Sequence, residues 1–290
     1  MKLGKLGVWA GLDSLTAAEA ADFARLAEAQ GYAALWMPEG FGRNVLVNAA
    51  WILANTSRLV VASGIANIYA RDAMAMANAQ QGLAEQSGGR FLLGMGVSHA
   101  PMVQKVRGHE YGKPVAGMRE YLEAMAKVRY LAPPPAERPL TVIAALGPKM
   151  LALAAELTDG VHPYNVTPEH TAEARAVLGP DKLICVEQKV ILSTDAATAR
   201  AAGRAALGVY MSLPNYRNNW LRLGFKEDDL AGTGSDRLID AMFAWGDEDA
   251  IRRRIEAHWA AGADHVCIQS VAADGAHTPD TKVLALLAPG

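Results

Sequence analysis

The sequence lacks the defining features of several large classes of protein. No apolar run approaches the roughly 20 residues that a membrane-spanning helix needs, and the opening residues Met1–Trp9 lead directly into a strand pattern without a cleavage site. Neither sign of charge predominates, because the sequence has 28 Lys and Arg residues and 30 Asp and Glu residues. Such a balance provides no broad basic surface for nucleic acid. We therefore expect a soluble cytoplasmic protein that acts on neither nucleic acids nor membranes.

Cysteine is scarce, and histidine is scattered. The two cysteines, Cys185 and Cys267, both lie inside apolar runs, which favours buried free thiols over the alternative of a disulfide. Neither cysteine has the electropositive, helix-starting surroundings that would activate a nucleophile. The seven histidines lack the clustered carboxylates of a metal-dependent hydrolase, so we expect no catalytic metal.

Nucleotide-binding and hydrolase motifs are also missing. The stretch Gly94–His99 contains two glycines of a dinucleotide fingerprint but lacks the third. The sequence has no phosphate-binding loop that ends in Gly-Lys-Ser/Thr and no Gly-x-Ser-x-Gly nucleophile turn. What remains is typical of an enzyme whose cofactor carries the chemistry.

Short apolar runs alternate with long helical patterns along the whole chain. Continuous apolar runs are typical of parallel strands that are buried on both faces. Eight such runs occur, over Leu3–Ala10, Ala33–Met37, Leu59–Ala66, Phe91–Val97, Leu140–Leu146, Gly160–Tyr164, Leu183–Leu192 and His265–Val271. The count predicts an α/β fold, a (β/α)8 TIM barrel formed by one domain over residues 1–290, because a doubly wound sheet more often has fewer strands.

Two segments interrupt this alternation. They are His99–Gly117, between the fourth strand and its helix, and Leu213–Trp245, before a predicted helix over Glu248–Ala261. Long segments at strand ends are where barrels hold their specificity, so we expect both insertions to shape a substrate pocket.

Several helices have recognisable starts. Thr16 and Glu19 have the spacing of a capping box, and Asp72 is placed to cap the Ala- and Met-rich helix that follows it. Thr167 precedes a first-turn proline and is a further candidate cap.

Four motifs in a fixed order carry a resemblance to a known family. They are Gly31–Glu39, Leu59–Asp72, Gly89–Val97, and Gly147-Pro148 with Asp159-Gly160. Over essentially its full length the sequence resembles the bacterial luciferase-like superfamily, and within it the actinobacterial oxidoreductases that use the deazaflavin coenzyme F420 in place of FMN. The resemblance implies a barrel with an insertion region that binds F420, or alternatively FMN, at the carboxyl ends of its strands.

The resemblance also implies particular cofactor contacts. In relatives, the third strand contains a bulge with a cis peptide bond that supports the cofactor ring, and the matching pair here is Gly64-Ile65. Asn67 matches a position that hydrogen-bonds near the polar edge of the ring, although a strand-end Asn is otherwise most often a turn residue. Gly96 and Leu146, at the ends of the fourth and fifth strands, are further expected contacts.

The turn after the fifth strand is a candidate anion site. Gly147 and Pro148 open a helix whose first-turn amides are unpaired, and relatives use this turn, with Lys149 and Met150, to bind part of the cofactor. The alternative is simple helix initiation by Gly and Pro. Tyr164, on the next loop, is expected to add a hydrogen-bond donor.

The candidate catalytic residues depart from the pattern of the relatives that oxidise sugar phosphates. Those relatives have an acid followed by a catalytic His after the second strand, where this chain has Glu39 and Gly40. They have a catalytic Glu where this chain has Val97. Proton transfer would therefore fall to His99 or Glu39, although each has an ordinary alternative, as a loop histidine and as a solvated acid.

Two classes of function stay open at this point. The first is an F420-dependent oxidoreductase that transfers a hydride between the cofactor and a small organic substrate, with an FMN-dependent monooxygenase as its variant. The second is a protein that binds a flavin or deazaflavin without turnover. In either class the resemblance implies a homodimer, joined through the helices after the second and third strands.

Overall fold

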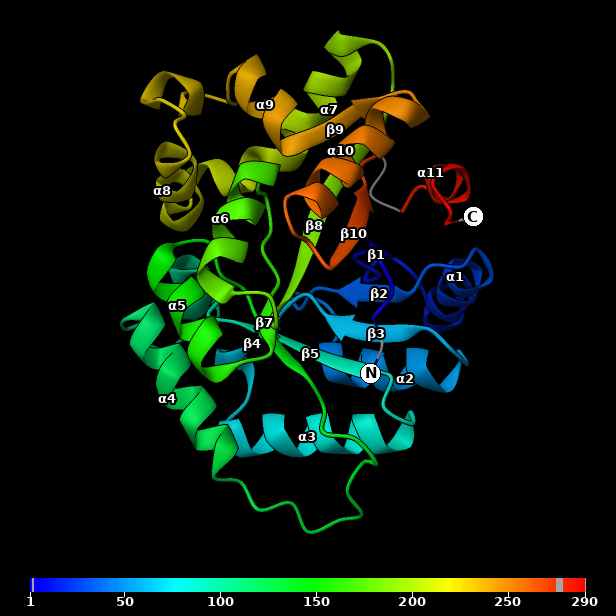
Figure 1. The fold of residues 1–290 in the computed structure, drawn as a ribbon, viewed down its shortest axis with the longest axis vertical. Coiled ribbons are helices and arrows are strands. Elements are labelled where there is room, and N and C mark those ends of the chain that lie inside the picture. The colour runs from blue at the N-terminus through cyan, green and yellow to red at the C-terminus, as the bar shows by residue number, and fades with distance from the viewer. Residues whose placement is uncertain (2, 275–278, 290) are drawn as a thin grey trace.

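The computed structural model describes residues 1, 3–274 and 279–289 as a parallel β-barrel surrounded by helices (Figure 1). The strands are β1 (Leu6–Trp9), β2 (Ala34–Met37), β3 (Val60–Ser63), β4 (Ala66–Asn67), β5 (Phe91–Gly96), β6 (Thr141–Ile143), β7 (Gly160–Val161), β8 (Leu183–Leu192), β9 (Phe243–Gly246) and β10 (His265–Ser270). All their pairings are parallel.

The barrel closes between its first and last strands. Leu6 on β1 pairs with Val266 on β10, and β10 pairs on its other side with β8 over His265–Ser270. The strand β3 pairs with the first part of β5, and the short strand β4 pairs with the last part of β5. Within the described residues, β3 and β4 therefore act as one interrupted strand position of a barrel that has eight such positions. The predicted TIM barrel with its eight strands is confirmed.

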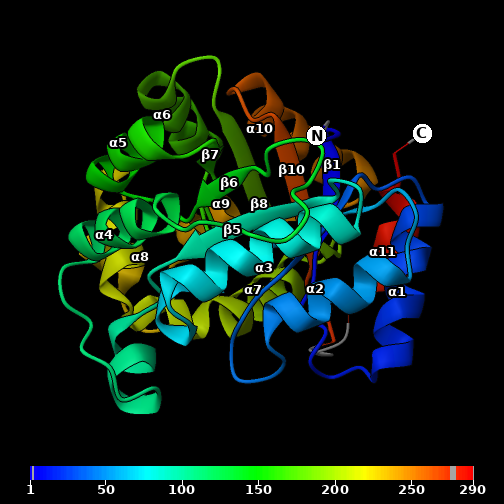
Figure 2. The same cartoon turned by 90° about the horizontal axis from the view of Figure 1, so that it is seen from below.

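Helices follow the strands and cover the outside of the barrel (Figure 2). They are α1 (Ala17–Ala29), α2 (Val45–Ala54), α3 (Ala73–Gln86), α4 (Pro114–Ala126), α5 (Pro148–Leu157), α6 (Pro168–Leu178), α7 (Ala196–Leu207), α8 (Pro214–Arg222), α9 (Asp236–Met242), α10 (Glu248–Ala260) and α11 (Thr281–Leu286).

Local sequence explains where the helices begin. Thr16 and Glu19 form the predicted capping box at α1, and the Asp72 side chain accepts a hydrogen bond from the Ala75 amide at the start of α3. Helix α6 begins at Pro168 as expected, but the Thr167 side chain makes no capping hydrogen bond.

The strands form the centre of the hydrophobic core. Large side chains such as Trp36 and Phe91 are completely buried among the strands and the inner faces of the helices. Cys185 and Cys267 are both free and buried, so the prediction of free thiols is confirmed.

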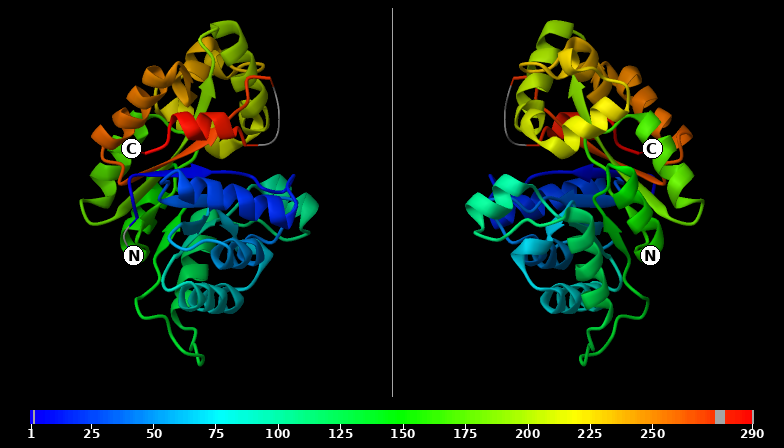
Figure 3. Two further views of the ribbon diagram at one scale, coloured as in Figure 1. Left: turned by 90° about the vertical axis from the view of Figure 1, so that its right-hand side faces the viewer. Right: turned by 90° about the vertical axis from the view of Figure 1, so that its left-hand side faces the viewer.

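The second insertion contains more structure than the sequence indicates. Instead of a long loop, residues 213–245 form helices α8 and α9 and enter β9, which pairs with the last four residues of β8. These elements gather with α7 over one end of the barrel (Figure 3). Strand β9 was missed because its four residues continue the apolar pattern of α9, and only the pairing with β8 makes them a strand.

The first insertion is closer to expectation. A π-helical turn over Pro101–Val106 and a short loop lead into α4, which begins at Pro114. Both insertions lie beyond the carboxyl ends of the strands that precede them, where they can contribute to a pocket.

The last helix of the chain packs against the first part of the barrel. Helix α11 lies beside α1 in all views, and the Tyr32 hydroxyl donates to the carbonyl oxygen of Leu284 over 2.8 Å. Among the helices of the described residues, none is both long and apolar enough to cross a membrane.

Candidate active site

A cavity of about 750 Å³ opens at the carboxyl ends of the barrel strands. Its wall consists of the residues that follow β1, β2, β3, β5, β6 and β7, together with the segment that includes α8. Ten of the predicted site residues line it: Glu39, Gly64, Ile65, Gly96, His99, Leu146, Gly147, Lys149, Met150 and Tyr164. The fold therefore brings together residues that are more than a hundred positions apart in the sequence.

The floor of the cavity contains the predicted cis peptide bond between Gly64 and Ile65, which is confirmed. The Trp9 indole N–H donates to the Gly64 carbonyl oxygen over 3.1 Å. A Cβ atom added to Gly64 would lie 2.9 Å from His162 Nε2, and one added to Gly96 would lie 2.7 Å from Ile65 Cδ1. Both glycines are therefore required by the close approach of neighbouring side chains.

Asn67 is a predicted site residue that does not line the cavity. It is buried outside the cavity wall, and its side-chain oxygen accepts a hydrogen bond from the Tyr69 amide over 2.9 Å. It caps a short 3-10 helix, Ile68–Ala70, so its role in the structure is that of a turn residue.

Glu39 reaches the cavity wall, but its carboxylate is directed into the protein. One oxygen forms an ion pair with Arg71, and the other accepts from the Asn67 amide over 2.8 Å. The two charged side chains are only 4% and 9% exposed. With its oxygens engaged in this way, Glu39 joins the loop after β2 to the end of β4, and the alternative that it is a solvated loop acid is wrong.

His99 is half-buried in the cavity wall. Burial lowers the pKa of its imidazole, while a hydrogen bond with Asn215 acts in the opposite direction. Its ring centroid lies 5.7 Å from that of Tyr216 on α8. The neutral imidazole is thus held against the insertion, at a place where it can contact a ligand.

His162 is a further histidine of the cavity wall, at the end of β7. Its Nδ1–H donates to the Cys185 carbonyl oxygen over 2.8 Å, and its ring stacks on Trp36 with 4.3 Å between the centroids. Burial lowers the pKa of His162 to about 4, so the ring is neutral near pH 7.

One end of the cavity is polar and cationic. The turn at Gly147 begins α5, and the exposed Lys149 lies in the first turn of that helix. Arg222, at the end of α8, forms an ion pair with Glu173 and donates to the Leu146 carbonyl oxygen and to Asn219 Oδ1. The Asn219 Nδ2 group is buried without a hydrogen-bond partner among the described residues. This end combines helix-terminal amides, the exposed Lys149 ammonium and an unused donor, a set that suits an anion.

The other end of the cavity is aromatic. The Tyr164 ring lies 5.4 Å from Trp9 and 5.5 Å from Tyr210, and Tyr210 lies 5.0 Å from Tyr216, measured between ring centroids. Burial raises the pKa of Tyr164 and of Tyr210, so both hydroxyls stay protonated.

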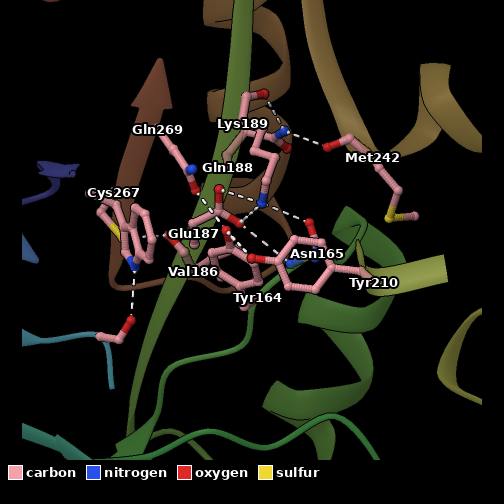
Figure 4. A network of polar contacts seen from close by, with 12 residues as sticks. Tyr164, Asn165, Val186, Glu187, Gln188, Lys189, Tyr210, Met242, Cys267 and Gln269 are labelled. Carbon is pink, nitrogen blue, oxygen red and sulfur yellow. Dashed lines mark hydrogen bonds and ion pairs between the residues drawn. The ribbon is translucent and has the colours of Figure 1, made fainter. Parts of the chain in front are cut away.

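A buried ion pair supports the aromatic end from behind (Figure 4). The Lys189 ammonium contacts both oxygens of Glu187 and the side-chain oxygen of Asn165, and it lies 3.6 Å from the centre of the Tyr164 ring. Burial raises the pKa of Glu187 and lowers that of Lys189, and each charge opposes the shift in the other. The pair is fully enclosed, and it fixes Tyr164 by a cation–π contact.

Sequence reasoning missed the residues that α8 and its approach supply, namely Tyr210, Tyr216, Asn219 and Arg222, as well as the pair Glu187 and Lys189. The pair had a visible signal, because Glu187-Gln188-Lys189 interrupts an otherwise apolar strand. Residues of α8 had none, since their place over the cavity follows from tertiary structure alone.

The profile of the luciferase-like monooxygenase family matches residues 3–265. The chain belongs to this family. A Mycobacterium tuberculosis protein, provisionally named a coenzyme F420-dependent oxidoreductase, is 27% identical over 94% of this chain and 96% of its own length. The resemblance inferred from the four sequence motifs is therefore confirmed.

Solved structures of family-like barrels show the same fold. An F420-dependent secondary alcohol dehydrogenase, solved with an F420–acetone adduct, aligns with a TM-score of 0.78 over 99% of this chain and 97% of its own at 16% identity. The oxygenating constituent of the 3,6-diketocamphane monooxygenase of Pseudomonas putida, solved with FMN, aligns with a TM-score of 0.70 over the same shares at 15% identity. Barrels of this shape thus hold either type of cofactor.

The cavity of this luciferase-like chain fits a flavin-type group. Its Gly64 and Gly96 lie where side chains would close the floor, and a Cβ atom added to Gly147 would meet nothing within 4 Å. The Asn219 Nδ2 donor is unpartnered among the described residues next to this open turn. In the described part of the chain, no three His, Cys, Asp or Glu side chains gather as a metal site would require.

Proposed function

We propose that this protein is an oxidoreductase that uses coenzyme F420 to oxidise or reduce a small organic molecule. The observation that carries the proposal is that one cavity at the carboxyl ends of the strands is lined both by the open, helix-starting turn at Gly147 and by the aromatic cluster around Tyr164. When bound, the deazaflavin supplies a ring that gives up or accepts a hydride.

The residues of this chain would divide the binding task. Gly147 and the first turn of α5, with Lys149, Asn219 and Arg222, would hold the phosphate-bearing tail. Gly64, Ile65 and Gly96 would support the ring. The apolar walls would exclude water from the reacting atoms, which strengthens every polar contact in the cavity.

FMN is the second candidate cofactor. It also carries a phosphate, so the anion site suits it, and one solved relative of the fold was crystallised with it. F420 is preferred because the relative that matches almost the full chain is named as an F420-dependent oxidoreductase.

A cofactor titration tests the proposal. Purified protein is mixed with F420 or FMN, and binding is followed by the absorbance and fluorescence of each cofactor. We expect saturable binding of F420 that is tighter than that of FMN, and consumption of reduced F420 without oxygen when a substrate is present. Tighter binding of FMN, with oxygen-dependent turnover, would replace the deazaflavin assignment by a monooxygenase. Binding without any turnover would favour a carrier protein.

A further inference from the structure

Three side chains form a hydrogen-bonded chain at the aromatic end of the cavity (Figure 4). The Tyr210 hydroxyl lies 3.1 Å from the Tyr164 hydroxyl, which lies 2.9 Å from Oε1 of Gln269 on β10. Tyr164 and Tyr210 line the cavity. The cavity end of the chain is thus a phenol, and its inner end is an amide.

Neighbouring side chains hold this hydrogen-bonded chain of Tyr210, Tyr164 and Gln269 in place. Lys189 lies under the Tyr164 ring, and Gln269 pairs with Lys189 in the register of β8 and β10. The Tyr216 ring packs edge-on against Tyr210. A polar group that is fixed by neighbours keeps its direction when a ligand binds, so less ordering is needed at that moment.

The charges near this end are already neutralised. Lys189 is paired with Glu187, Glu39 is paired with Arg71, and His99 has a lowered pKa. In the described part of the aromatic wall, a ligand therefore meets ring faces and hydroxyls. That chemistry suits a neutral molecule with an apolar or aromatic body.

The hydrogen bonds that join Tyr210, Tyr164 and Gln269 can point in either direction. A phenolic O–H rotates and both donates and accepts, and a side-chain amide offers an acceptor oxygen and a donor nitrogen. When Gln269 presents its oxygen, Tyr164 donates to it, Tyr210 donates to Tyr164, and Tyr210 is left as an acceptor. When the amide presents its nitrogen, every bond reverses, and Tyr210 becomes a donor toward the cavity.

We infer that Tyr210 binds the oxygen of a neutral carbonyl or alcohol substrate, and that the direction of the Tyr164–Gln269 hydrogen bonds decides which of the two it can hold. A ketone or aldehyde oxygen only accepts, so it binds only when Tyr210 donates, whereas an alcohol both donates and accepts and can bind with the hydrogen bonds in either direction. The inference rests on the proposed function for the identity of the reaction, and it names the substrate class.

Competition between matched probes tests this inference. Acetophenone, 1-phenylethanol and ethylbenzene share an aromatic body and differ in their oxygen. Their binding to the protein, alone and with oxidised F420, is measured by ligand-observed NMR. We expect the wild-type protein to prefer both oxygenated probes over ethylbenzene by roughly three- to tenfold, the size of one hydrogen bond.

The variants separate a hydrogen-bonding role from a structural one. Tyr210→Phe removes the hydroxyl and should abolish the preference for both oxygenated probes. Gln269→Glu, measured near pH 8 so that the carboxylate opposite Lys189 is ionised, only accepts. It fixes Tyr210 as an acceptor, so 1-phenylethanol should keep its advantage while acetophenone loses it.

Tyr216→Phe removes the competing hydroxyl of the same aromatic wall, and Tyr32→Phe is the matched control, because Tyr32 loses a buried, hydrogen-bonded hydroxyl outside the cavity. In both variants the preference for oxygenated probes should equal that of the wild type. Loss of the preference in Tyr216→Phe but not in Tyr210→Phe would overturn the inference, and so would equal weakening of both oxygenated probes in Gln269→Glu. Far-UV circular dichroism and melting curves establish that each variant is folded.

The outcome is independent of the cofactor titration. If the probes follow the expected pattern but F420 does not bind, the substrate site stands and the proposed cofactor fails. If F420 binds but the wild-type protein does not distinguish the probes, the proposed function stands and this substrate class is wrong.

Discussion

At the scale of single residues, the barrel interior contains imidazoles that burial keeps neutral. His162 donates to the Cys185 carbonyl, and His265 accepts from the Trp36 indole N–H over 3.0 Å. Burial lowers the pKa of each to about 4. In the unfolded chain the same groups would titrate near their ordinary value of 6.5. Folding therefore competes with protonation in acid.

We predict that stability falls as the pH decreases from about 6.5 toward 4, because the unfolded chain then binds more protons than the folded one. Each histidine contributes about 1.4 kcal/mol per pH unit within this window. His162→Gln removes one such group, so the loss of unfolding free energy on acidification should be smaller than in the wild type. Urea unfolding at several pH values measures it, with exposed His109→Gln as the control. If the unfolding free energy changes equally with pH in the wild type, His162→Gln and His109→Gln, the lowered pKa of His162 is contradicted.

Gly147 provides a second prediction at this scale. A Cβ atom here meets no protein atom within 4 Å, and the residue has an ordinary backbone conformation as the N-cap of α5. Gly147→Val should therefore fold, yet its side chain would occupy the approach to the first-turn amides. We expect F420 binding to weaken strongly in this variant.

Lys149→Ala is the matched comparison at the same turn. Its ammonium is exposed, so its removal should cost only about 0–1 kcal/mol of binding free energy. Fluorescence titration of both variants measures the difference. If Lys149→Ala abolishes binding while Gly147→Val binds normally, the cofactor anion is held by a side chain and not by backbone amides.

Single residues were predicted best where a strand end fixes their position. Gly64, Gly147 and Tyr164 all lie at the cavity, because the carboxyl ends of parallel strands meet at one face of a barrel. Glu39 lies there too, but its ion pair with Arg71 depends on a side chain 32 positions further along, and no local pattern indicates it. Asn67 lies outside the cavity wall, and its side-chain oxygen accepts a hydrogen bond from the Tyr69 amide in a local turn.

At the scale of elements, the Glu39–Arg71 pair links the loop after β2 to the segment between β4 and α3. Both side chains are almost fully buried, and the Asn67 amide completes the contacts of the carboxylate. A buried charge that loses its partner is left uncompensated.

We predict that Glu39→Ala and Arg71→Ala each lower the unfolding free energy by about 3–5 kcal/mol, whereas Glu39→Leu combined with Arg71→Met is much closer to the wild type. Chemical denaturation of the three variants measures these values. A single variant as stable as the wild type would show that the pair does not hold these elements together, and would return Glu39 to the candidate acids.

Long, regular helices and strands could be predicted from the sequence more accurately than short ones. The ten-residue strand Leu183–Leu192 has the predicted bounds, while Gly160–Val161 is shorter than the apolar run that marked it. Helices α8 and α9 are only nine and seven residues long, and α8 is polar overall, so neither marks itself clearly in the sequence. They pack into a separate cluster of buried residues around Trp220 and Leu238, which only the folded chain brings together.

At the scale of the whole molecule, the order of strands follows directly from the alternation in the sequence, because right-handed strand–helix–strand connections place successive parallel strands side by side until the barrel closes. The extent of a single domain over residues 1–290 stays a prediction, as does the homodimer.

The surface carries one feature that bears on the dimer. Helices α2 and α3 lie side by side and expose apolar side chains, with Val47 69% and Met74 59% exposed (Figure 2).

We predict that the protein is a dimer joined through this face of α2 and α3. Covering exposed apolar surface contributes about 25 cal/mol per Å², and Met adapts to an irregular partner surface. Light scattering at micromolar concentration should give twice the chain mass, and Val47→Lys combined with Met74→Lys should give the monomer with an unchanged fold. Leu131→Lys is the control, because Leu131 is 80% exposed but lies outside both helices, in the connection between α4 and β6. A monomeric wild-type protein, or a dimer that Leu131→Lys disrupts as readily as the double variant, would show that this face does not join two copies.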